Sequence, residues 1–179
     1  MRRIRYSVAM SLDGYIAGPN GEYDWIEVDP SSGADYFKKL YAQFDTVLMG
    51  RKSYEQAGGG VSPFKTYVLS RTLPPGKRGK VTVLGGDALA RVAALREEPG
   101  KDIWLWGGGE LFGSLAGAGL VDSVEVGVIP VLLGAGRKVM AGCERRIKLV
   151  PRPTNLELPG HTLLTYDVEK PGTKRKRVG

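Results

Sequence analysis

The segment 101–112, KDIWLWGGGELF, constrains the fold of this chain more than any other stretch. Residues 103–106 form a short apolar run with the length and aromatic content of a buried strand. Three glycines follow at once, and the apolar residues after them, Leu111, Phe112, Leu115 and Ala116, recur at a spacing that suits a helix. The segment therefore predicts a buried strand that turns on glycine directly into a helix.

A junction of this kind leaves backbone N–H groups free and directs the positive end of the helix dipole at one place. Such a place suits an anion, above all the phosphates of a nucleotide. The alternative is a tight turn in which glycine only supplies a positive φ. The dinucleotide fingerprint does not fit, because Phe112 stands where its third glycine would be, and the chain has no Walker A sequence.

Length and composition indicate one ordinary globular domain. The chain has 179 residues and an average apolar content. We expect neither a membrane span nor a signal peptide, because the required apolar patterns are missing from the sequence. The single cysteine, Cys143, excludes an internal disulfide and fits a reducing compartment, so we expect a cytoplasmic protein. With one histidine and one cysteine, no zinc site is expected.

The formal net charge of +7 comes mostly from the C-terminus. Segment 170–179 holds five lysines and arginines and no acid, and removing these five charges leaves +2 for the rest. We expect a folded domain over 1–169 and a disordered basic tail over 170–179. Nucleic-acid binding is not expected as the main function, because no aromatic stacking platform accompanies the basic run.

Short apolar runs alternate with helical patterns along much of the chain. Strands are predicted at 4–10, 46–49, 66–69, 81–84 and 103–106. A helix capped by Ser31 or Ser32 presents Phe37, Leu40, Tyr41 and Phe44, and a second helix covers 87–98. This alternation predicts an α/β protein with a mostly parallel sheet and helices on its faces. The runs 123–129, 147–150 and 161–168 lack a long helix between them and should add antiparallel edge strands.

Polar and glycine residues follow several of these strands. Gly50-Arg51-Lys52-Ser53-Tyr54 comes after the second strand, and Ser70-Arg71 after the third. Two cations at a helix start oppose the helix dipole, which indicates an anion there. Because ligands of open α/β sheets lie at the carboxyl ends of the strands, these residues predict a second phosphate contact.

The segments 11–21, 73–76 and 132–137 read as loops or turns. The first is rich in turn residues but carries Leu12, Tyr15 and Ile16, so we expect it to fold over a ligand. Asp13 is its most interesting carboxylate, although an Asp-Gly pair commonly serves only as a turn. His161 lies beside a predicted turn and is expected to be a satisfied surface residue, since no Gly-x-Ser-x-Gly elbow supports a hydrolase.

Five stretches of the sequence occur in the order seen in one known family. They are Ser11-Leu12-Asp13-Gly14, Met49-Gly50-Arg51-Lys52-Ser53-Tyr54, Leu69-Ser70-Arg71, Gly107-Gly108-Gly109-Glu110-Leu111-Phe112 and Pro130-Val131-Leu132-Leu133-Gly134-Ala135-Gly136. Over residues 3–169 the chain resembles dihydrofolate-reductase-like proteins. More narrowly, it is similar to the reductase domain of the bifunctional riboflavin-biosynthesis protein.

The resemblance implies an NADPH-dependent reductase built on a central, mostly parallel sheet of about eight strands. It implies a catalytic role near the reacting centre for Asp13, and a nicotinamide site lined by Ala9 and Ile16. It further implies a cis peptide bond between Gly107 and Gly108. The remaining cofactor-binding residues implied are Gly50, Arg51, Lys52 and Ser53 for the phosphates, Leu69, Ser70 and Arg71 for the adenosine, and Gly107, Gly108, Gly109, Glu110, Leu111 and Phe112 beneath the pyrophosphate and nicotinamide.

The sequence departs from dihydrofolate reductases at one position. Their acidic helix residue, counted back from Tyr36-Phe37-Lys38, falls on Gly33, and Asp35 is two residues away. We therefore leave the substrate open among pterins, a ribosylated pyrimidine of riboflavin biosynthesis and other imine or carbonyl compounds. The chain lacks the zinc-binding residues of the deaminase domain that precedes the reductase in the bifunctional protein.

Two functions and one assembly remain as hypotheses. The first function is hydride transfer from NADPH, and the second is NADPH or nucleotide binding without turnover, since Asp13 is the only obvious proton donor. We also expect a homodimer, as in the related reductases. A cluster of apolar residues is too large for one exposed sheet edge, so we expect a partner to cover it. Its members are Val126, Val128, Ile129, Val131, Leu132 and Leu133.

Overall fold

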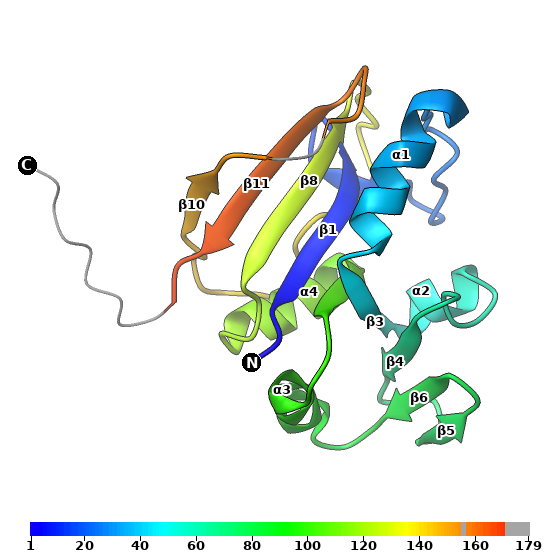
Figure 1. The fold of residues 1–179 in the computed structure, drawn as a ribbon, viewed down its shortest axis with the longest axis vertical. Helices are drawn as coiled ribbons and strands as arrows, with labels where there is room; N and C mark the ends of the chain where they lie inside the picture. Colours follow the sequence, from blue (N-terminus) through cyan, green and yellow to red (C-terminus); the bar gives the residue numbers. More distant parts are fainter. Residues whose placement is uncertain (155–156, 171–179) are drawn as a thin grey trace, which may run out of the picture.

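The computed structural model describes residues 1–154 and 157–170 and contains one large mixed sheet (Figure 1). Its nine strands run in the spatial order β10-β11-β8-β1-β7-β3-β4-β6-β5. In chain order they are β1 (Ile4–Ser11), β3 (Phe44–Gly50), β4 (Lys65–Leu69), β5 (Gly76–Arg78), β6 (Val81–Leu84), β7 (Asp102–Gly107), β8 (Ser123–Ile129), β10 (Leu149–Arg152) and β11 (Thr162–Val168). A separate pair joins β2 (Tyr15–Ala17) to β9 (Arg137–Lys138).

The expected α/β class and the mostly parallel sheet are confirmed. The neighbouring strands from β8 through β1, β7, β3 and β4 to β6 all pair in parallel. The antiparallel pairs lie at the two ends of the sheet, where β11 joins β8 and β10, and β5 joins β6. Buried parallel strands read as continuous apolar runs, which is why their sequence signal was strong.

Helices cover both faces of the sheet, as predicted. They are α1 (Pro30–Tyr41), α2 (Arg51–Gln56), α3 (Ala88–Glu97) and α4 (Gly109–Gly117). Strand β7 shows how the faces divide, because successive side chains point to opposite sides. Ile103 and Leu105 pack in one core with residues of α3 and α4, whereas Trp104 packs in a second core with Leu40 of α1. Each face therefore has its own hydrophobic core.

The start of α1 differs from the expectation. Asp29, and neither Ser31 nor Ser32, caps the helix, and its carboxylate accepts a hydrogen bond from the Ser31 backbone N–H at 2.8 Å. Pro30 occupies the first turn, where its missing N–H costs nothing. The Asp-Pro-Ser order thus starts the helix two residues earlier than the serines suggested. Helix α3 begins after Asp87, close to the expected boundary.

Short strands account for the remaining differences. The predicted turn at 73–76 leads into β5, and the predicted loops 11–21 and 132–137 contribute β2 and the first residue of β9. Strand β10 covers Leu149–Arg152 and not 147–150. These strands have two to four residues and form only against distant partners, so their own sequences carry little periodic signal.

The first residue of the predicted basic tail makes contacts with the folded domain. Lys170 lies inside the described structure, and its Nζ donates to the carbonyl oxygens of Gly119 and Val121, both at 3.1 Å. The rest of the predicted basic tail, 171–179, lies outside the described residues. No helix in the described ranges is long and apolar enough to cross a membrane.

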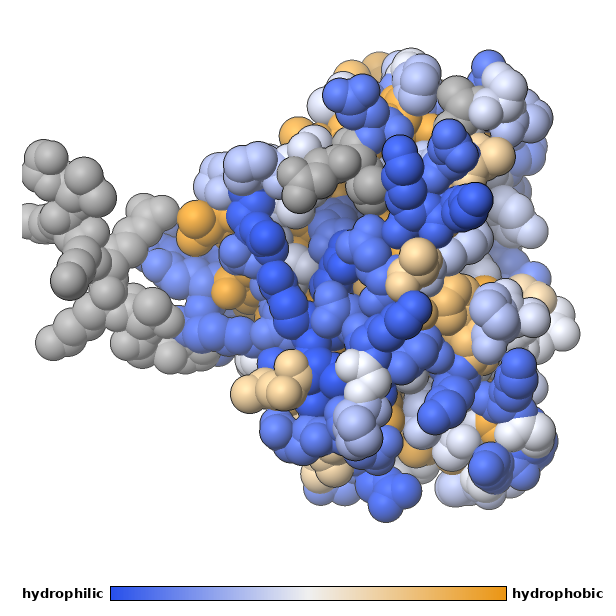
Figure 2. Space-filling model, in the orientation of Figure 1, coloured by the Kyte–Doolittle hydropathy of each residue, from blue (hydrophilic) through white to orange (hydrophobic). Residues whose placement is uncertain are grey.

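The face shown in Figure 2 is mainly hydrophilic, with apolar residues in small separate areas. The apolar cluster behind the expected homodimer is mostly buried by the chain itself. Val126 is in the core and Val128 packs against it, because β8 lies between β1 and β11 and is not an edge strand. Leu132 alone of this cluster is largely exposed, at 69 %. The homodimer stays a prediction, but the exposed apolar sheet edge from which we inferred it is not present in the described residues.

Candidate functional site

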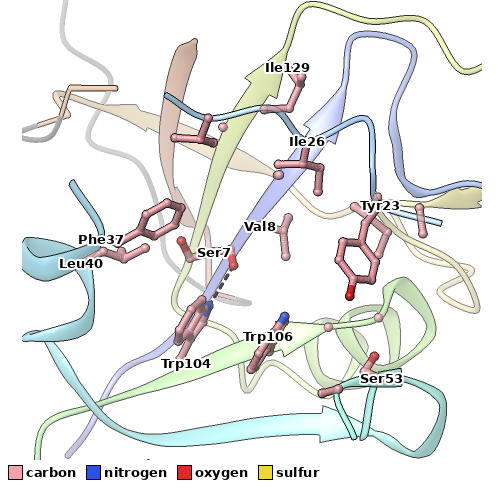
Figure 3. Close-up of a pocket in the computed structure, with 18 of the residues that line it drawn as sticks. Ser7, Val8, Tyr23, Ile26, Phe37, Leu40, Ser53, Trp104, Trp106 and Ile129 are labelled. Atoms are coloured by element: carbon pink, nitrogen blue, oxygen red, sulfur yellow. Dashed lines mark hydrogen bonds between the residues drawn. The ribbon is translucent and has the colours of Figure 1, made fainter. Parts of the chain in front are cut away.

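A cavity of about 490 Å³ lies between α1, the middle of the sheet and the glycine turn that follows β7 (Figure 3). Its walls come from distant parts of the chain, because β1, β7 and β8 are neighbours in the sheet. The lining residues are Ser7, Val8, Ala9, Ile16, Ala17, Gly21, Tyr23, Ile26, Val28, Tyr36, Phe37, Leu40, Tyr41, Ser53, Gln56, Ala57, Trp104, Trp106, Gly107, Gly108, Gly127, Ile129, Arg137 and Leu158.

One end of the cavity is aromatic. The rings of Trp104 and Trp106 stack with centroids 5.4 Å apart and planes within 8° of each other. Trp104 is held in place by a hydrogen bond from Nε1 to the Ser7 carbonyl at 2.8 Å, whereas Nε1 of Trp106 has no partner in the described part of the chain. Phe37 and Leu40 of α1 complete this end (Figure 3). A flat, mostly apolar ligand with one hydrogen-bond acceptor suits these walls.

Burial raises the pKa of the two tyrosines that α1 contributes to this end. The pKa of Tyr36 is raised first by desolvation and then by the negative charge of Glu125, and that of Tyr41 by desolvation alone. Both phenols therefore stay protonated near neutral pH and can donate a hydrogen bond to a ligand.

The other end of the cavity is polar and brings together predicted residues from three stretches. Gly108 lies between Ile16 and Ser53, since a β-carbon on Gly108 would lie 3.9 Å from Ile16 Cδ1 and from Ser53 Oγ. Ala9 and Gly107 also line the cavity. Five residues that the family resemblance assigned to the cofactor thus share one cavity.

The other predicted phosphate and adenosine contacts lie side by side at the carboxyl edge of the sheet. Gly50 pairs in register with Leu69 across β3 and β4, and Met49 pairs with Gly107 across β3 and β7. The segments that leave these strands, 50–53, 69–71 and 107–112, therefore start at adjacent strand ends. None of 50–52 or 69–71 is among the residues that line the cavity, so this row forms a separate, open surface beside it.

The side chains of this row differ in how far they are already engaged. Arg51 faces Glu55 on its own helix at 3.9 Å, a long and exposed contact that is worth little. Ser70 Oγ accepts the backbone N–H groups of Thr72 and Leu73 at 3.1 and 2.9 Å, so this hydroxyl shapes the turn. Lys52 and Arg71 are exposed and make no ion pair within the described residues.

The glycine triplet forms a tight turn and places free backbone N–H groups at the start of α4. The bond between Gly107 and Gly108 is cis, as expected, and Gly107 has a φ of +144°. Gly108 is the N-cap of α4 and has no side-chain acceptor, which leaves N–H groups of the first turn to a ligand. Gly109 faces away, because a β-carbon there would lie 2.2 Å from the Lys138 carbonyl oxygen. The lack of a side chain at Gly109 is therefore needed for the close packing of α4 against Lys138.

The residues that follow the triplet belong mainly to the core. The ring of Phe112 is buried and stacks on Tyr6 with centroids 4.2 Å apart, and Leu111 packs against the same core. Glu110 is exposed in the first turn of α4. In the first turn of α4, the backbone and the Glu110 side chain are therefore the groups available to a cofactor.

Asp13 is placed as a connector of two loops. Its carboxylate accepts hydrogen bonds from Ser11 Oγ at 2.6 Å and from the backbone N–H groups of Leu133 and Gly134 at 3.1 and 2.7 Å. The hydrogen bond from Ser11, followed by those from the backbone, lowers the pKa of the Asp13 carboxyl. The Asp13 carboxylate is therefore ionised near neutral pH. Asp13 is not among the residues that line the cavity, and its catalytic role stays a prediction.

No aspartate or glutamate occurs among the described residues that line the cavity. Gly33 stands at the position where dihydrofolate reductases carry their acid, and it is buried against Val28. A β-carbon on Gly33 would lie 2.5 Å from Val28 Cγ1, so there is no room for a larger residue. Asp35 is exposed on α1. His161 lies outside the cavity, with Nδ1 and Nε2 each 3.0 Å from a carbonyl oxygen, of Pro159 and Glu27. Over the described ranges, no group of three His, Cys, Asp or Glu side chains could hold a metal ion.

Sequence reasoning missed several polar side chains of the cavity, among them Tyr23, Gln56 and Arg137. Tyr23 and Arg137 line it, and Figure 3 shows the Tyr23 hydroxyl directed toward the side of Trp106 and Ser53. Arg137 follows the glycine-rich segment 134–136 directly, which could have indicated a cation placed by a tight turn. Nothing in the sequence near Tyr23 separates it from an ordinary loop tyrosine.

Comparison with known proteins agrees with this geometry. The sequence profile of the RibD C-terminal domain family matches residues 2–62 and 63–168. The chain belongs to this family. Two relatives from Bacillus subtilis (strain 168), the uncharacterized proteins YyaP and YwjB, are 36 % and 34 % identical over 164 and 134 residues. These alignments cover 83 % of this chain and 85 % of YyaP, and 72 % of this chain and 77 % of YwjB.

Solved structures of this family and of dihydrofolate reductase share the fold. A protein from Shewanella sp. PV-4, provisionally named as a riboflavin biosynthesis protein, aligns with a TM-score of 0.76 and 26 % identity over 95 % of this chain and 100 % of its own. Dihydrofolate reductase from Enterococcus faecalis aligns with a TM-score of 0.66 at 19 % identity, covering 94 % and 97 % of the two chains. The deaminase/reductase of Thermotoga maritima aligns with a TM-score of 0.66 at 16 % identity, and this chain spans 56 % of it.

Proposed function

We propose that this chain is a reductase that uses NADPH to transfer a hydride to the C=N or C=O group of a flat small molecule. Pterins, pyrimidines and related imine or carbonyl compounds are the substrate classes. One observation carries the proposal: the open row of strand ends at 50–53, 69–71 and 107–108 adjoins a cavity with an aromatic end. The row suits an extended dinucleotide, and the aromatic end suits a ring beside it.

The residues present fit such a cofactor. Lys52 and Arg71 have no ion-pair partner among the described residues, and Gly108 leaves the first N–H groups of α4 without a side-chain acceptor. Gly108 lines the cavity without a side chain, which would let a flat ring lie close to the backbone there. The dihydrofolate reductase of Enterococcus faecalis was solved in complex with NADP(H), which supports a nucleotide for this fold.

In the proposed reaction, the bound dihydronicotinamide supplies the hydride, which adds to the carbon of the C=N or C=O bond. The stacked Trp104 and Trp106, together with Phe37, hold the acceptor ring. The substrate nitrogen or oxygen takes a proton as the hydride arrives. Trp106 Nε1 and the Tyr23 hydroxyl face the cavity. They can polarise the C=N or C=O bond by donating hydrogen bonds to its nitrogen or oxygen. Because the described walls include no carboxylic acid, the proton comes from solvent.

The missing carboxylic acid also favours a second candidate function, the binding of NADPH or a related nucleotide without turnover. The two are separated by titrating NADPH against the intrinsic fluorescence of Trp104 and Trp106 and then following NADPH absorbance with pterin, pyrimidine, imine and carbonyl substrates. We expect saturable binding and substrate-dependent oxidation. Binding without oxidation by any substrate class would favour the second candidate. Absence of NADPH binding would refute the first, and absence of binding by related nucleotides as well would refute both.

A further inference from the structure

Arg137 is a cation in the cavity that the proposed reaction does not use. It lies on β9, where its backbone pairs with Ala17 of β2. Its guanidinium packs against Gly21, since a β-carbon on Gly21 would lie 2.9 Å from Arg137 Nη2. Gly21 has a φ of +98° and no side chain, and so leaves this space to the guanidinium. The segment from β2 to Gly21 and strand β9 thus together position one positive charge.

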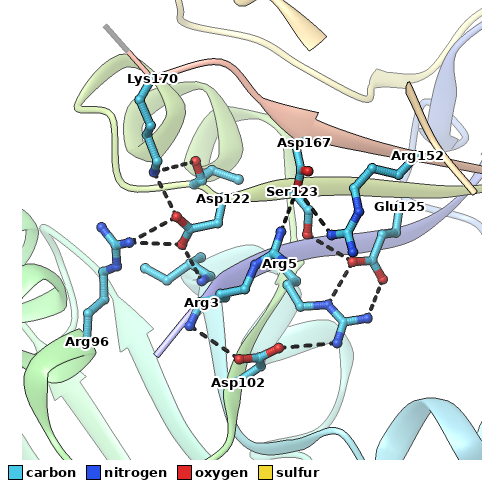
Figure 4. Close-up of polar contacts among 12 residues, drawn as sticks. Arg3, Arg5, Arg96, Asp102, Asp122, Ser123, Glu125, Arg152, Asp167 and Lys170 are labelled. Carbon is cyan, nitrogen blue, oxygen red and sulfur yellow. Dashed lines mark hydrogen bonds and ion pairs between the residues drawn. The ribbon is translucent and has the colours of Figure 1, made fainter. Parts of the chain in front are cut away.

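The arginines at the amino edge of the sheet provide a contrast (Figure 4). Arg96 contacts both oxygens of Asp122 at 3.0 Å, and these side chains are only 12 % and 13 % exposed. Arg5 makes a two-bond contact with Glu125, each bond 2.7 Å long. Arg137 has no such acid, because over the described ranges no carboxylate lies within 4.0 Å of it. A half-buried charge without a counterion is costly, and a bound anion offsets that cost.

The surroundings of Arg137 are neutral hydrogen-bonding groups. Gln56 of α2 donates from Nε2 to the Gly21 carbonyl, which ties the helix to the loop that faces the guanidinium. Ser53 and Gly108 line the same cavity. The Ser53 hydroxyl makes no hydrogen bond within the described chain. We place Arg137 at the polar end, because the carbonyl oxygen of the next residue, Lys138, packs against Gly109 of the glycine junction.

We propose that Arg137 binds a phosphate group of the ligand, through the paired hydrogen bonds that a guanidinium makes with phosphate oxygens. This inference rests on the proposed function and deepens it. The geometry favours the phosphate next to the nicotinamide ribose, because Arg137 shares the polar end with Gly108 and Ser53. A phosphate on the substrate has the same chemistry, and the experiment separates the two sources.

The test compares two reduced cofactor fragments that differ by this phosphate, nicotinamide mononucleotide and nicotinamide riboside. Affinities are measured by tryptophan fluorescence for wild type, Arg137→Gln and the matched control Lys138→Gln, whose side chain is exposed and outside the cavity. We expect wild type to bind the mononucleotide roughly ten- to a hundredfold more tightly, the range for one charge-assisted contact. Arg137→Gln should reduce this ratio to less than about threefold, and Lys138→Gln should preserve it.

Binding of 2′,5′-ADP reports the other end of the cofactor and serves as the folding control, so it should be equal in all three proteins. An undiminished ratio in Arg137→Gln, with KM values for phosphorylated and dephosphorylated substrates also unchanged, overturns the inference. A different result in Arg137→Gln is an undiminished affinity ratio with a KM that rises only for the phosphorylated substrate. That result assigns the phosphate bound by Arg137 to the substrate. If wild type binds neither NADPH nor 2′,5′-ADP, the proposed function itself fails.

Discussion

The two edges of the central sheet differ in how their charged side chains are paired. At the amino edge, Arg5, Arg96 and Lys170 each contact a carboxylate at 3.0 Å or less. At the carboxyl edge and the adjoining cavity, Lys52, Arg71 and Arg137 make no ion pair within the described residues. Charges that face each other across strands of the amino edge stabilise the fold. We propose that the cations of the carboxyl edge, which lack such partners within the described residues, bind a ligand instead.

This difference indicates which charges matter for stability and which for binding. A charged group that is buried with its partner becomes destabilising when the partner is removed. An exposed, unpaired cation contributes little to stability. Substitutions at the amino edge should therefore lower the free energy of unfolding, and those at the carboxyl edge should lower ligand affinity.

The largest effect is expected for Asp122→Ala at the amino edge. Asp122 accepts hydrogen bonds from the Ile4 backbone N–H, from Arg96 and from Lys170. Removing the carboxylate leaves the buried Arg96 guanidinium without its ion-pair partner. We therefore expect the free energy of unfolding to fall by about 3 kcal/mol, as in other broken buried pairs. Urea denaturation measures it, with Arg71→Ala as the control that should lose less than about 0.5 kcal/mol. Similar losses for both variants would remove the contrast between the edges.

The next effect concerns how α4 is seated at the carboxyl edge. A β-carbon on Gly113 would lie 1.9 Å from the Ala141 carbonyl oxygen, whereas one on Gly117 would meet only Cys143 Sγ at 3.8 Å. Gly113→Ala should therefore cost about 2 kcal/mol of unfolding free energy through overpacking. Gly117→Ala, on the same helix, should be neutral or stabilising by up to about 1 kcal/mol. Thermal and urea unfolding of the two variants compare them directly, and a harmless Gly113→Ala would argue against the close contact.

Loss of one cation at the carboxyl edge should weaken cofactor binding and leave stability unchanged. The 2′-phosphate distinguishes NADPH from NADH, and Arg51 and Arg71 start from adjacent strand ends. We expect Arg51→Ala or Arg71→Ala to weaken NADPH binding by roughly ten- to a hundredfold and NADH binding hardly at all, because one charge-assisted contact is lost. Titration of both cofactors checks this. Equal losses for the two cofactors would move these arginines to the shared pyrophosphate.

The smallest effect is expected for Asp13→Asn. Asp13 fixes the loops at 11–14 and 130–134, and the chain leaves the first of these into β2, which carries Ile16 to the cavity. Losing one charge-assisted acceptor should cut kcat by on the order of tenfold and change the NADPH dissociation constant by less than about twofold. Steady-state kinetics and a cofactor titration separate these quantities. An unchanged kcat would leave Asp13 as a loop connector alone.

The sequence by itself determined the central architecture. The strands at 46–49, 66–69 and 103–106 were found because residues buried on both faces of a parallel sheet form short apolar runs. The strand at 4–10 was found because apolar residues alternate along it with less apolar ones. The glycine and polar residues after each run showed which edge would take a ligand, because parallel strands end on the same side. The order of five short motifs then indicated the family, which the sequence profile confirms.

Only the tertiary structure decided the features that depend on distant partners. The β2–β9 pair, the position of Arg137 beside Gly21 and the acceptor role of Asp13 each join residues far apart in the chain. The packing role of Gly109 against the Lys138 carbonyl oxygen is likewise invisible in a run of glycines. Local patterns report burial and turns, whereas the partner of a charge or a backbone group is set by which segments the folded sheet brings together.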